Sequence, residues 1–207
     1  MNRHTLILSI CGIIAPALYT IVVIVLSFLW SDYNPVAQAI SELGGPDAPN
    51  AIIMNTVGFA LTGILITAFA YGLHRGINEG RGSKIGPALV AVYGLGMVGV
   101  GLFPWDKANL ASSATMMHSV FGWIHWIAIT LAPLVIARRF KNDHKWKSYR
   151  LYGWATGLVT AVLIVIYLLT AAGAYGGVIQ RMVVGAQLLW IEIMAIRLLR
   201  LSTQSST

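Results

Sequence analysis

Two histidines lie on one hydrophobic stretch of the chain, the run 115–137, where contact with lipid would not require them. His118 and His125 are seven residues apart, almost two helical turns, so on a helix they share a face and lie roughly 10 Å apart along the axis. Gly122 stands between them and would leave a notch between the two imidazoles. A lone histidine in such a run is usually a neutral core residue, whereas this pair with its glycine favours a ligand-binding pocket.

A second pair of ionisable residues stands on the last hydrophobic run, 178–199. Arg181 and Glu192 are eleven residues apart, about three helical turns, so they share a face on which Gly185 and Leu188 also lie. Arg181 is suited to bind an anionic group, or alternatively to reach lipid headgroups with its long side chain. Glu192 is suited to bond a neighbouring helix or to hold a proton, and the sequence does not separate these roles.

The elements that position these residues are predicted to be membrane-spanning helices. Of the 207 residues, 57% are hydrophobic and 10% are charged, against about 45–50% and about 25% in soluble domains. A helix needs about 20 apolar residues to cross a membrane. Six runs meet this length, and we expect an all-α bundle forming a single transmembrane domain over residues 1–207, with spans at about 5–30, 51–74, 84–104, 115–137, 150–173 and 178–199.

The distribution of positive charge predicts the orientation of the bundle. Twelve of the fourteen Lys and Arg residues fall on one side of a six-span chain, and only Lys107 and Arg181 fall on the other. The positive-inside rule then places both termini in the cytoplasm. We expect the protein to lie in the plasma (inner) membrane. The charges are sorted by loop and form no single patch, which argues against nucleic acid as a partner and for contact with the lipid bilayer.

A short polar stretch between the first two spans reads as a helix that lies along the outer interface. The residues 34–46 are NPVAQAISELGGP, in which Asn34 is a good N-cap, Pro35 a favoured first residue and the Gly-Gly-Pro end a stop. Its apolar residues fall on one face and leave Gln38, Ser41 and Glu42 on the other. This polar face turns to water, or alternatively covers the mouth of the bundle as a lid.

The expected topology brings several polar side chains to one outward-facing layer, which the short helix would cover. Glu42, Asp106, His118 and Arg181 are expected in that layer, His125 nearer the middle of the membrane and Glu192 in the inner half. The full set of candidate pocket residues is Ser41, Glu42, Asp106, His118, His125, Arg181 and Glu192.

Five motifs occur along the chain in an order that resembles the DUF998 family of six-span prokaryotic membrane proteins. They are YNPVAQAISELGGPDAPN after the first span, NTVGFALTGILITAFAYGL in the second, GLFPWD ending the third, MHSVFGWIHW in the fourth and GVIQR opening the sixth. The resemblance covers most of the chain and implies a six-span fold. It implies no chemistry, and it directs attention to the matching positions Ser41, Glu42, Asp106, His118, His125 and Arg181.

Four kinds of function remain open, and whether the protein is an enzyme is not decided by the sequence. We favour binding or passage of a small amphiphilic or anionic ligand, such as a lipid. A metal-dependent hydrolase acting on lipid at the outer leaflet would use zinc with His118 and Asp106 as ligands, joined by Glu42 or His125. A haem or pigment protein would use one histidine as an axial ligand. A structural subunit that assembles with partner membrane subunits would need no pocket.

Overall fold

The computed structural model describes residues 3–77, 84–171 and 173–204, and within them it is all helical, with no strand. Six helical segments are long and apolar enough to cross a membrane, as the sequence predicts. These are α1 (Arg3–Leu29), the second span made of α2 (Ala51–Ile53), η2 (Met54–Leu61) and α3 (Thr62–Gly76), α4 (Ile85–Leu102), α5 (Ser113–Phe140), α6 (Arg150–Thr170) preceded by η3 (Lys147–Tyr149), and α7 (Gly176–Gln204).

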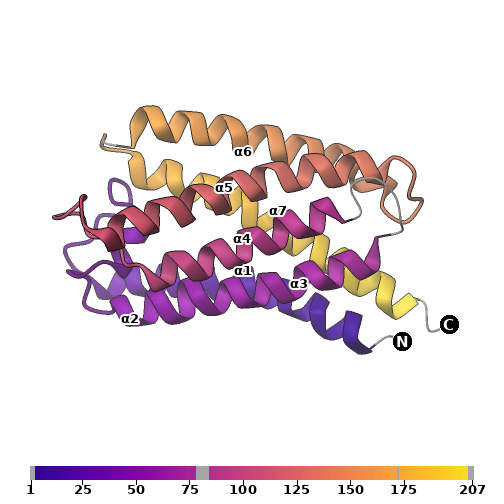
Figure 1. Ribbon diagram of the computed structural model, residues 1–207, viewed down its shortest axis with the longest axis horizontal. Coiled ribbons are helices and arrows are strands. Elements are labelled where there is room, and N and C mark those ends of the chain that lie inside the picture. Colours follow the sequence, from indigo (N-terminus) through magenta and orange to yellow (C-terminus); the bar gives the residue numbers. More distant parts are fainter. Residues whose placement is uncertain (1–2, 78–83, 172, 205–207) are drawn as a thin grey trace.

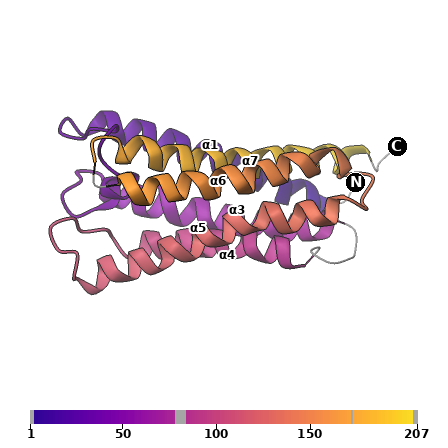
Figure 2. The same cartoon turned by 90° about the horizontal axis from the view of Figure 1, so that it is seen from above.

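The helices run along the long axis of the molecule, and the start of α1 and the end of α7 lie at the same end of it (Figure 1). Each span packs against the next one in the chain, and α7 returns to pack against α1, so the six spans form a closed ring. Figure 2 shows the same bundle from above, with the spans nearly aligned. The connections 31–50, 103–112 and 173–175 gather at the end away from the termini. We call it the loop end.

Large apolar side chains fill the ring in the half nearer the termini. Phe69, Ile136, Ile191 and Met194 are each fully buried there. Burying apolar side chains of this size stabilises a packed core by dispersion contacts even where lipid surrounds the bundle. This half of the bundle is therefore a solid core that supports the loop end.

Close packing of α4 against α5 sets the position of the second histidine. A Cβ atom on Gly96 would lie 2.5 Å from the Cβ atom of His125, so any larger residue at position 96 would push α5 away. The His125 ring then lies 5.5 Å from the ring of Tyr93, centroid to centroid. A glycine on α4 thus places a histidine of α5 against an aromatic wall.

The second span contains a π-helix of eight residues, η2, which the sequence did not predict. Just after it, the hydroxyl of Thr62 donates to the carbonyl of Val57 at 3.4 Å. Such segments are rare and occur often at functional sites. Here the π-helix carries Phe59, whose side chain belongs to the cavity described below.

The segment between the first two spans differs from the amphipathic helix predicted there. Instead of two and a half helical turns starting at Asn34, the chain forms a turn and then a 3₁₀ helix, η1 (Ile40–Gly44). The reason is that backbone groups needed for a continuous helix bond to α7. Val36 and Ala37 carbonyls accept from the amides of Val178 and Gly177, and the Ile40 amide donates to Oε1 of Gln180. The predicted stop is correct, since η1 ends at Gly44.

Candidate functional site

A cavity of about 720 Å³ opens at the loop end of the bundle. A volume of this size is ordinary for a small-molecule site. It is lined by residues from all six spans, by the segment 37–42 and by the loop after α4. Its aromatic and imidazole side chains come from Tyr19, Phe59, Trp105, His118, Trp123, His125, Trp126 and Tyr167, and its other polar side chains include Gln38, Ser41, Glu42, Lys107, Ser119 and Gln180.

Both histidines border this cavity, and the backbone fixes the hydrogen on each ring. Nδ1 of His118 lies 2.7 Å from the carbonyl oxygen of Phe103, and Nδ1 of His125 lies 2.9 Å from that of Phe121. A carbonyl oxygen only accepts, so both Nδ1 atoms carry the hydrogen and donate it. In a neutral imidazole the Nε2 atom then carries a lone pair, which is able to accept a hydrogen bond or to bind a metal.

Aromatic rings hold the two imidazoles in place. The ring centroid of His118 lies 5.8 Å from that of Trp105 and 6.3 Å from that of Phe59. His125 lies 6.3 Å from Trp126 in the same measure, in an edge-on arrangement. Ring orientation fixed by packing and by a second-nitrogen hydrogen bond is how proteins hold imidazoles ready for a ligand.

Gly122 lies between the two histidines and also borders the cavity. A Cβ atom at this position would have no neighbouring heavy atom within 4 Å. Among the described glycines, Gly185 on α7 has the same open surroundings, but it is exposed on the outside of the bundle. Gly122 therefore leaves space inside the cavity that a side chain would fill.

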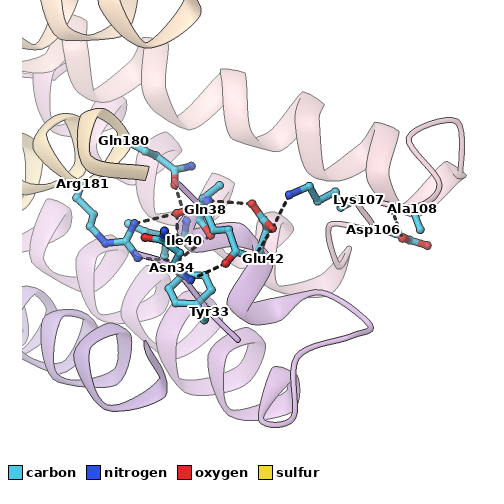
Figure 3. Close-up of polar contacts among 11 residues, drawn as sticks. Tyr33, Asn34, Gln38, Ile40, Glu42, Asp106, Lys107, Ala108, Gln180 and Arg181 are labelled. Atoms are coloured by element: carbon cyan, nitrogen blue, oxygen red, sulfur yellow. Dashed lines mark hydrogen bonds and ion pairs between the residues drawn. The ribbon is translucent and has the colours of Figure 1, made fainter. Parts of the chain in front are cut away.

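Arg181 does not border the cavity but fastens the segment above it. Its Nη1 donates to the carbonyl oxygen of Gln38 at 3.0 Å, and its Nη2 donates to the hydroxyl of Tyr33 (Figure 3). Nη1 also donates to the carbonyl oxygen of Gly177 at 3.1 Å. The guanidinium also lies 5.5 Å from the centroid of the Tyr33 ring. Tyr33 in turn donates to the carbonyl of Ala39 at 2.9 Å, and burial raises the pKa of its phenol although Arg181 opposes the shift.

We call residues 33–44, the segment that Arg181 fastens, the cover segment. Glu42 is its second attachment. Its carboxylate accepts from the amide of Ala39 at 2.9 Å and from Nε2 of Gln38 at 3.0 Å, and it pairs with Lys107 at 3.2 Å (Figure 3). Glu42 borders the cavity, and so does Ser41. The cover segment is thus joined to α7 by Arg181 and to the loop after α4 by Glu42.

Besides Arg181, two of the residues singled out from the sequence lie apart from the cavity. Oδ1 of Asp106 accepts from the amides of Ala108 and Asn109, so this carboxylate shapes its own loop. Glu192 does not border the cavity and, in residues 3–77, 84–171 and 173–204, forms no hydrogen bond or ion pair. The structure therefore brings together Ser41, Glu42, His118 and His125 at the cavity, with Arg181 behind them.

A metal-binding cluster is not found in the described part of the chain. No group of three or more His, Cys, Asp or Glu side chains there lies close enough together to hold a metal ion. The carboxylate of Asp106 is held by backbone amides, as described above, and that of Glu42 by Ala39, Gln38 and Lys107.

Several cavity residues were not identified from the sequence. Trp105 is one of them, and Gln180 is another, although Gln180 is polar and next to Arg181 in the sequence. Gln180 could have been identified from its amide side chain, which stands at the start of a span and so faces a loop. Trp126 and Tyr167, whose ring centroids lie 5.1 Å apart, carry no signal because aromatic residues are common in spans.

Comparisons with other proteins assign a family but no activity. No curated protein and no solved structure matches the chain. A family model described as "Protein of unknown function (DUF998)" matches residues 13–197, which is most of the chain and includes the cavity residues named above. The chain is therefore a multi-pass membrane protein that belongs to the DUF998 family.

Proposed function

We propose that this protein binds a small, uncharged amphiphilic molecule in the cavity at its loop end, with the apolar part against the aromatic rings and a polar group near the histidines. The observation that carries the proposal is the pair of imidazoles, each with Nδ1 bonded to a backbone carbonyl and each bordering one cavity. Two neutral imidazoles oriented in this way offer Nε2 as acceptors. They suit a hydroxyl, amine or amide group of the ligand.

The charges around the cavity support an uncharged ligand. Arg181, the residue most suited by type to anchor an anion, already donates to Gln38, Gly177 and Tyr33. Lys107 borders the cavity but is paired with Glu42. Neither cation is left for a carboxylate or a phosphate without breaking the attachment of the cover segment.

We further propose that the loop end faces the outside of the cell and that both termini lie in the cytoplasm of the inner membrane. The positive-inside rule supports this orientation, because Lys107 and Arg181 are the basic residues at the loop end. The ligand would then come from the outer leaflet or from the medium beyond it.

A zinc-dependent hydrolase is the second candidate, and one observation favours it. Zinc-binding histidines commonly donate the hydrogen of their other nitrogen to a carbonyl, as His118 and His125 do. A catalytic zinc site has three protein ligands, however, and the described residues offer no such cluster. A haem site is less favoured, because both histidines belong to α5 and do not face each other from two helices.

The proposal is tested by a substitution that fills part of the cavity with a side chain. Gly122→Leu places a side chain in the open space between the histidines, and Gly185→Leu places the same side chain on the outer surface of the bundle. Native mass spectrometry of gently purified protein, with elemental analysis, records bound small molecules and metal. We expect a retained uncharged amphiphile in the wild type and in Gly185→Leu and its loss in Gly122→Leu.

Other results of this experiment have a defined meaning. Zinc at one atom per chain that is lost in His118→Ala supports the hydrolase. Equal retention of the amphiphile by all three proteins contradicts binding in this cavity. A wild-type protein that holds neither amphiphile nor metal, and that is not stabilised by an added alcohol such as 1-dodecanol, supports a structural subunit instead.

A further inference from the structure

Five polar atoms are buried without a hydrogen-bond partner in the described part of the bundle, and four of them belong to α6 and α7 just beyond the cavity. These four are Nε2 and Oε1 of Gln187, Oγ1 of Thr160 and Nε1 of Trp190. The exposed fractions of these residues are 1% for Gln187, 1% for Thr160 and 0% for Trp190. A buried polar group left unbonded is destabilising, so four such atoms on two adjacent helices call for partners.

The layer continues the walls of the cavity toward the middle of the membrane. On α7 the cavity is lined by Gln180 and Val184, and Gln187 follows Val184 by three residues on the same face. On α6 it is lined by Tyr167, and Thr160 precedes Tyr167 by seven residues, which is again the same face. Both polar residues therefore stand on cavity-lining faces, one to two turns deeper.

The two residues also lie at one depth. The helices α6 and α7 run antiparallel, pack together and are joined by the short connection after Thr170. Thr160 is ten residues before the end of α6 and Gln187 eleven residues after the start of α7, or about 15 Å and about 17 Å along their axes. Trp190 is three residues from Gln187 on α7 and so one turn deeper.

We propose that Gln187, Thr160 and Trp190 form a polar subsite below the cavity, which holds an uncharged group able both to donate and to accept hydrogen bonds. The amide of Gln187 offers a donor and an acceptor side by side, Thr160 offers a hydroxyl and Trp190 offers a donor. Ordered water has this chemistry, and so does the hydroxyl or amide end of an amphiphile that reaches past His125. Occupation of the subsite by the amphiphile rests on the proposed function, whereas occupation by water does not.

Hydroxyl-radical footprinting read by mass spectrometry tests the subsite, because radicals formed from bound water oxidise the side chains next to it. The molecule provides an internal control. Trp146 is also 0% exposed, but its Nε1 donates to the carbonyl of Gly76 at 3.1 Å. In delipidated protein reconstituted in nanodiscs we expect Trp190 to be oxidised several-fold faster than Trp146. Gln187→Leu and, as a second and milder variant, Thr160→Val are expected to bring Trp190 to the rate of Trp146.

Addition of 1-dodecanol distinguishes the two sources. Protection of Trp190 by the alcohol assigns the subsite to the polar end of the ligand, and unchanged oxidation assigns it to water. Oxidation of Trp190 in a protein that binds no dodecanol supports the subsite while rejecting the proposed function. A Trp190 as unreactive as Trp146 in the wild type without alcohol overturns the proposal.

Discussion

Arg181 at the start of the last span donates a hydrogen bond to the carbonyl oxygen of Gln38, 143 residues earlier in the chain, at 3.0 Å. The bond joins the cover segment to the helix that forms one wall of the cavity. A basic residue that the sequence suggests as an anion anchor is therefore a fastening between two parts of the protein. Its substitution is expected to change the closure of the cavity before it changes any contact with ligand.

Replacing Arg181 by Ala is expected to loosen the cover segment. The variant loses donors to Gln38, Gly177 and Tyr33, and bonds from a charged donor contribute about 1.5–3 kcal/mol each when buried. Hydrogen exchange of the Gly177 and Val178 amides, which donate to Ala37 and Val36, is expected to accelerate by at least about tenfold. Arg200→Ala, at an exposed position at the other end of α7, is the control, and equal exchange in both variants contradicts this role.

Replacing Gly177 by Ala is expected to separate the cover segment from α7 without removing any charge. A Cβ atom at this position would overlap the carbonyl oxygen of Gln38 and lie 2.6 Å from that of Pro35. Both are backbone atoms, so the segment itself must move. The check is faster exchange of the Ile40 amide, which donates to Gln180. Gly185→Ala serves as the control, because its Cβ atom would meet nothing within 4 Å. An unchanged exchange rate of the Ile40 amide in Gly177→Ala would show that close contact between Gly177 and the cover segment is not required.

The two partners of the ion pair are expected to contribute unequally. The Lys107 side chain is 67% exposed, and Lys107→Ala is expected to lower the stability of the closed segment by less than about 1 kcal/mol. Glu42→Ala also removes the acceptor of the Ala39 amide and of Gln38, and we expect a loss larger by about 1 kcal/mol. Local hydrogen exchange of the Ala39 amide measures both. Equal losses of stability in the two variants would mean that Glu42 contributes only through its ion pair with Lys107.

Removing the acceptor of the deeper histidine is expected to weaken ligand binding. His125→Phe keeps an aromatic ring beside Tyr93 and Trp126 but has no Nε2, and the lost hydrogen bond corresponds to about a tenfold rise in the Kd of 1-dodecanol. Binding is measured by native mass spectrometry titration. His144→Phe, at an exposed position between α5 and α6, is expected to leave the Kd unchanged. Unchanged affinity in both variants rules out His125 as a ligand contact.

The orientation of the bundle is checked by labelling engineered cysteines. Cys11 is the only cysteine of the chain, so Cys11→Ser provides a background without thiols. In intact cells a membrane-impermeant maleimide is expected to label Lys107→Cys and to leave Lys141→Cys unlabelled until the membrane is permeabilised. Both positions are exposed, and they follow α4 and α5, which run in opposite directions along the bundle. The reverse pattern places the cavity on the cytoplasmic side.

The six spans were predicted correctly because their length and apolar composition are local properties of the sequence. The shape of the cover segment was not, because it depends on contacts with residues far along the chain. Asn34, Pro35 and the apolar spacing favour a helix locally, and the amides of Gly177 and Val178 override that preference by bonding to Ala37 and Val36. The prediction needed the position of α7, which no local pattern contains.

For the cavity, residue type and spacing pointed to the histidines that border it, but not to the hydrogen bonds that the charged side chains form. Helical spacing alone put His118, Gly122 and His125 on one face, and the structure has all three at the cavity. For Arg181 and Asp106 the charge is read from the residue type, whereas their bonds to nearby backbone depend on loop geometry. Charge at the expected depth is therefore weaker evidence that a residue borders a cavity than spacing along one helix.

The capping of α7 by the cover segment has a consequence for how binding responds to the medium. The amides of Gly176, Gly177, Val178 and Ile179, which begin this helix, donate to the carbonyls of Gly173, Ala37, Val36 and Tyr175. The positive end of the helix dipole is thus covered by carbonyl oxygens and does not attract anions into the cavity. Entry of a molecule then depends on its shape and solubility instead of on long-range attraction, and its rate should be the same at low and high ionic strength.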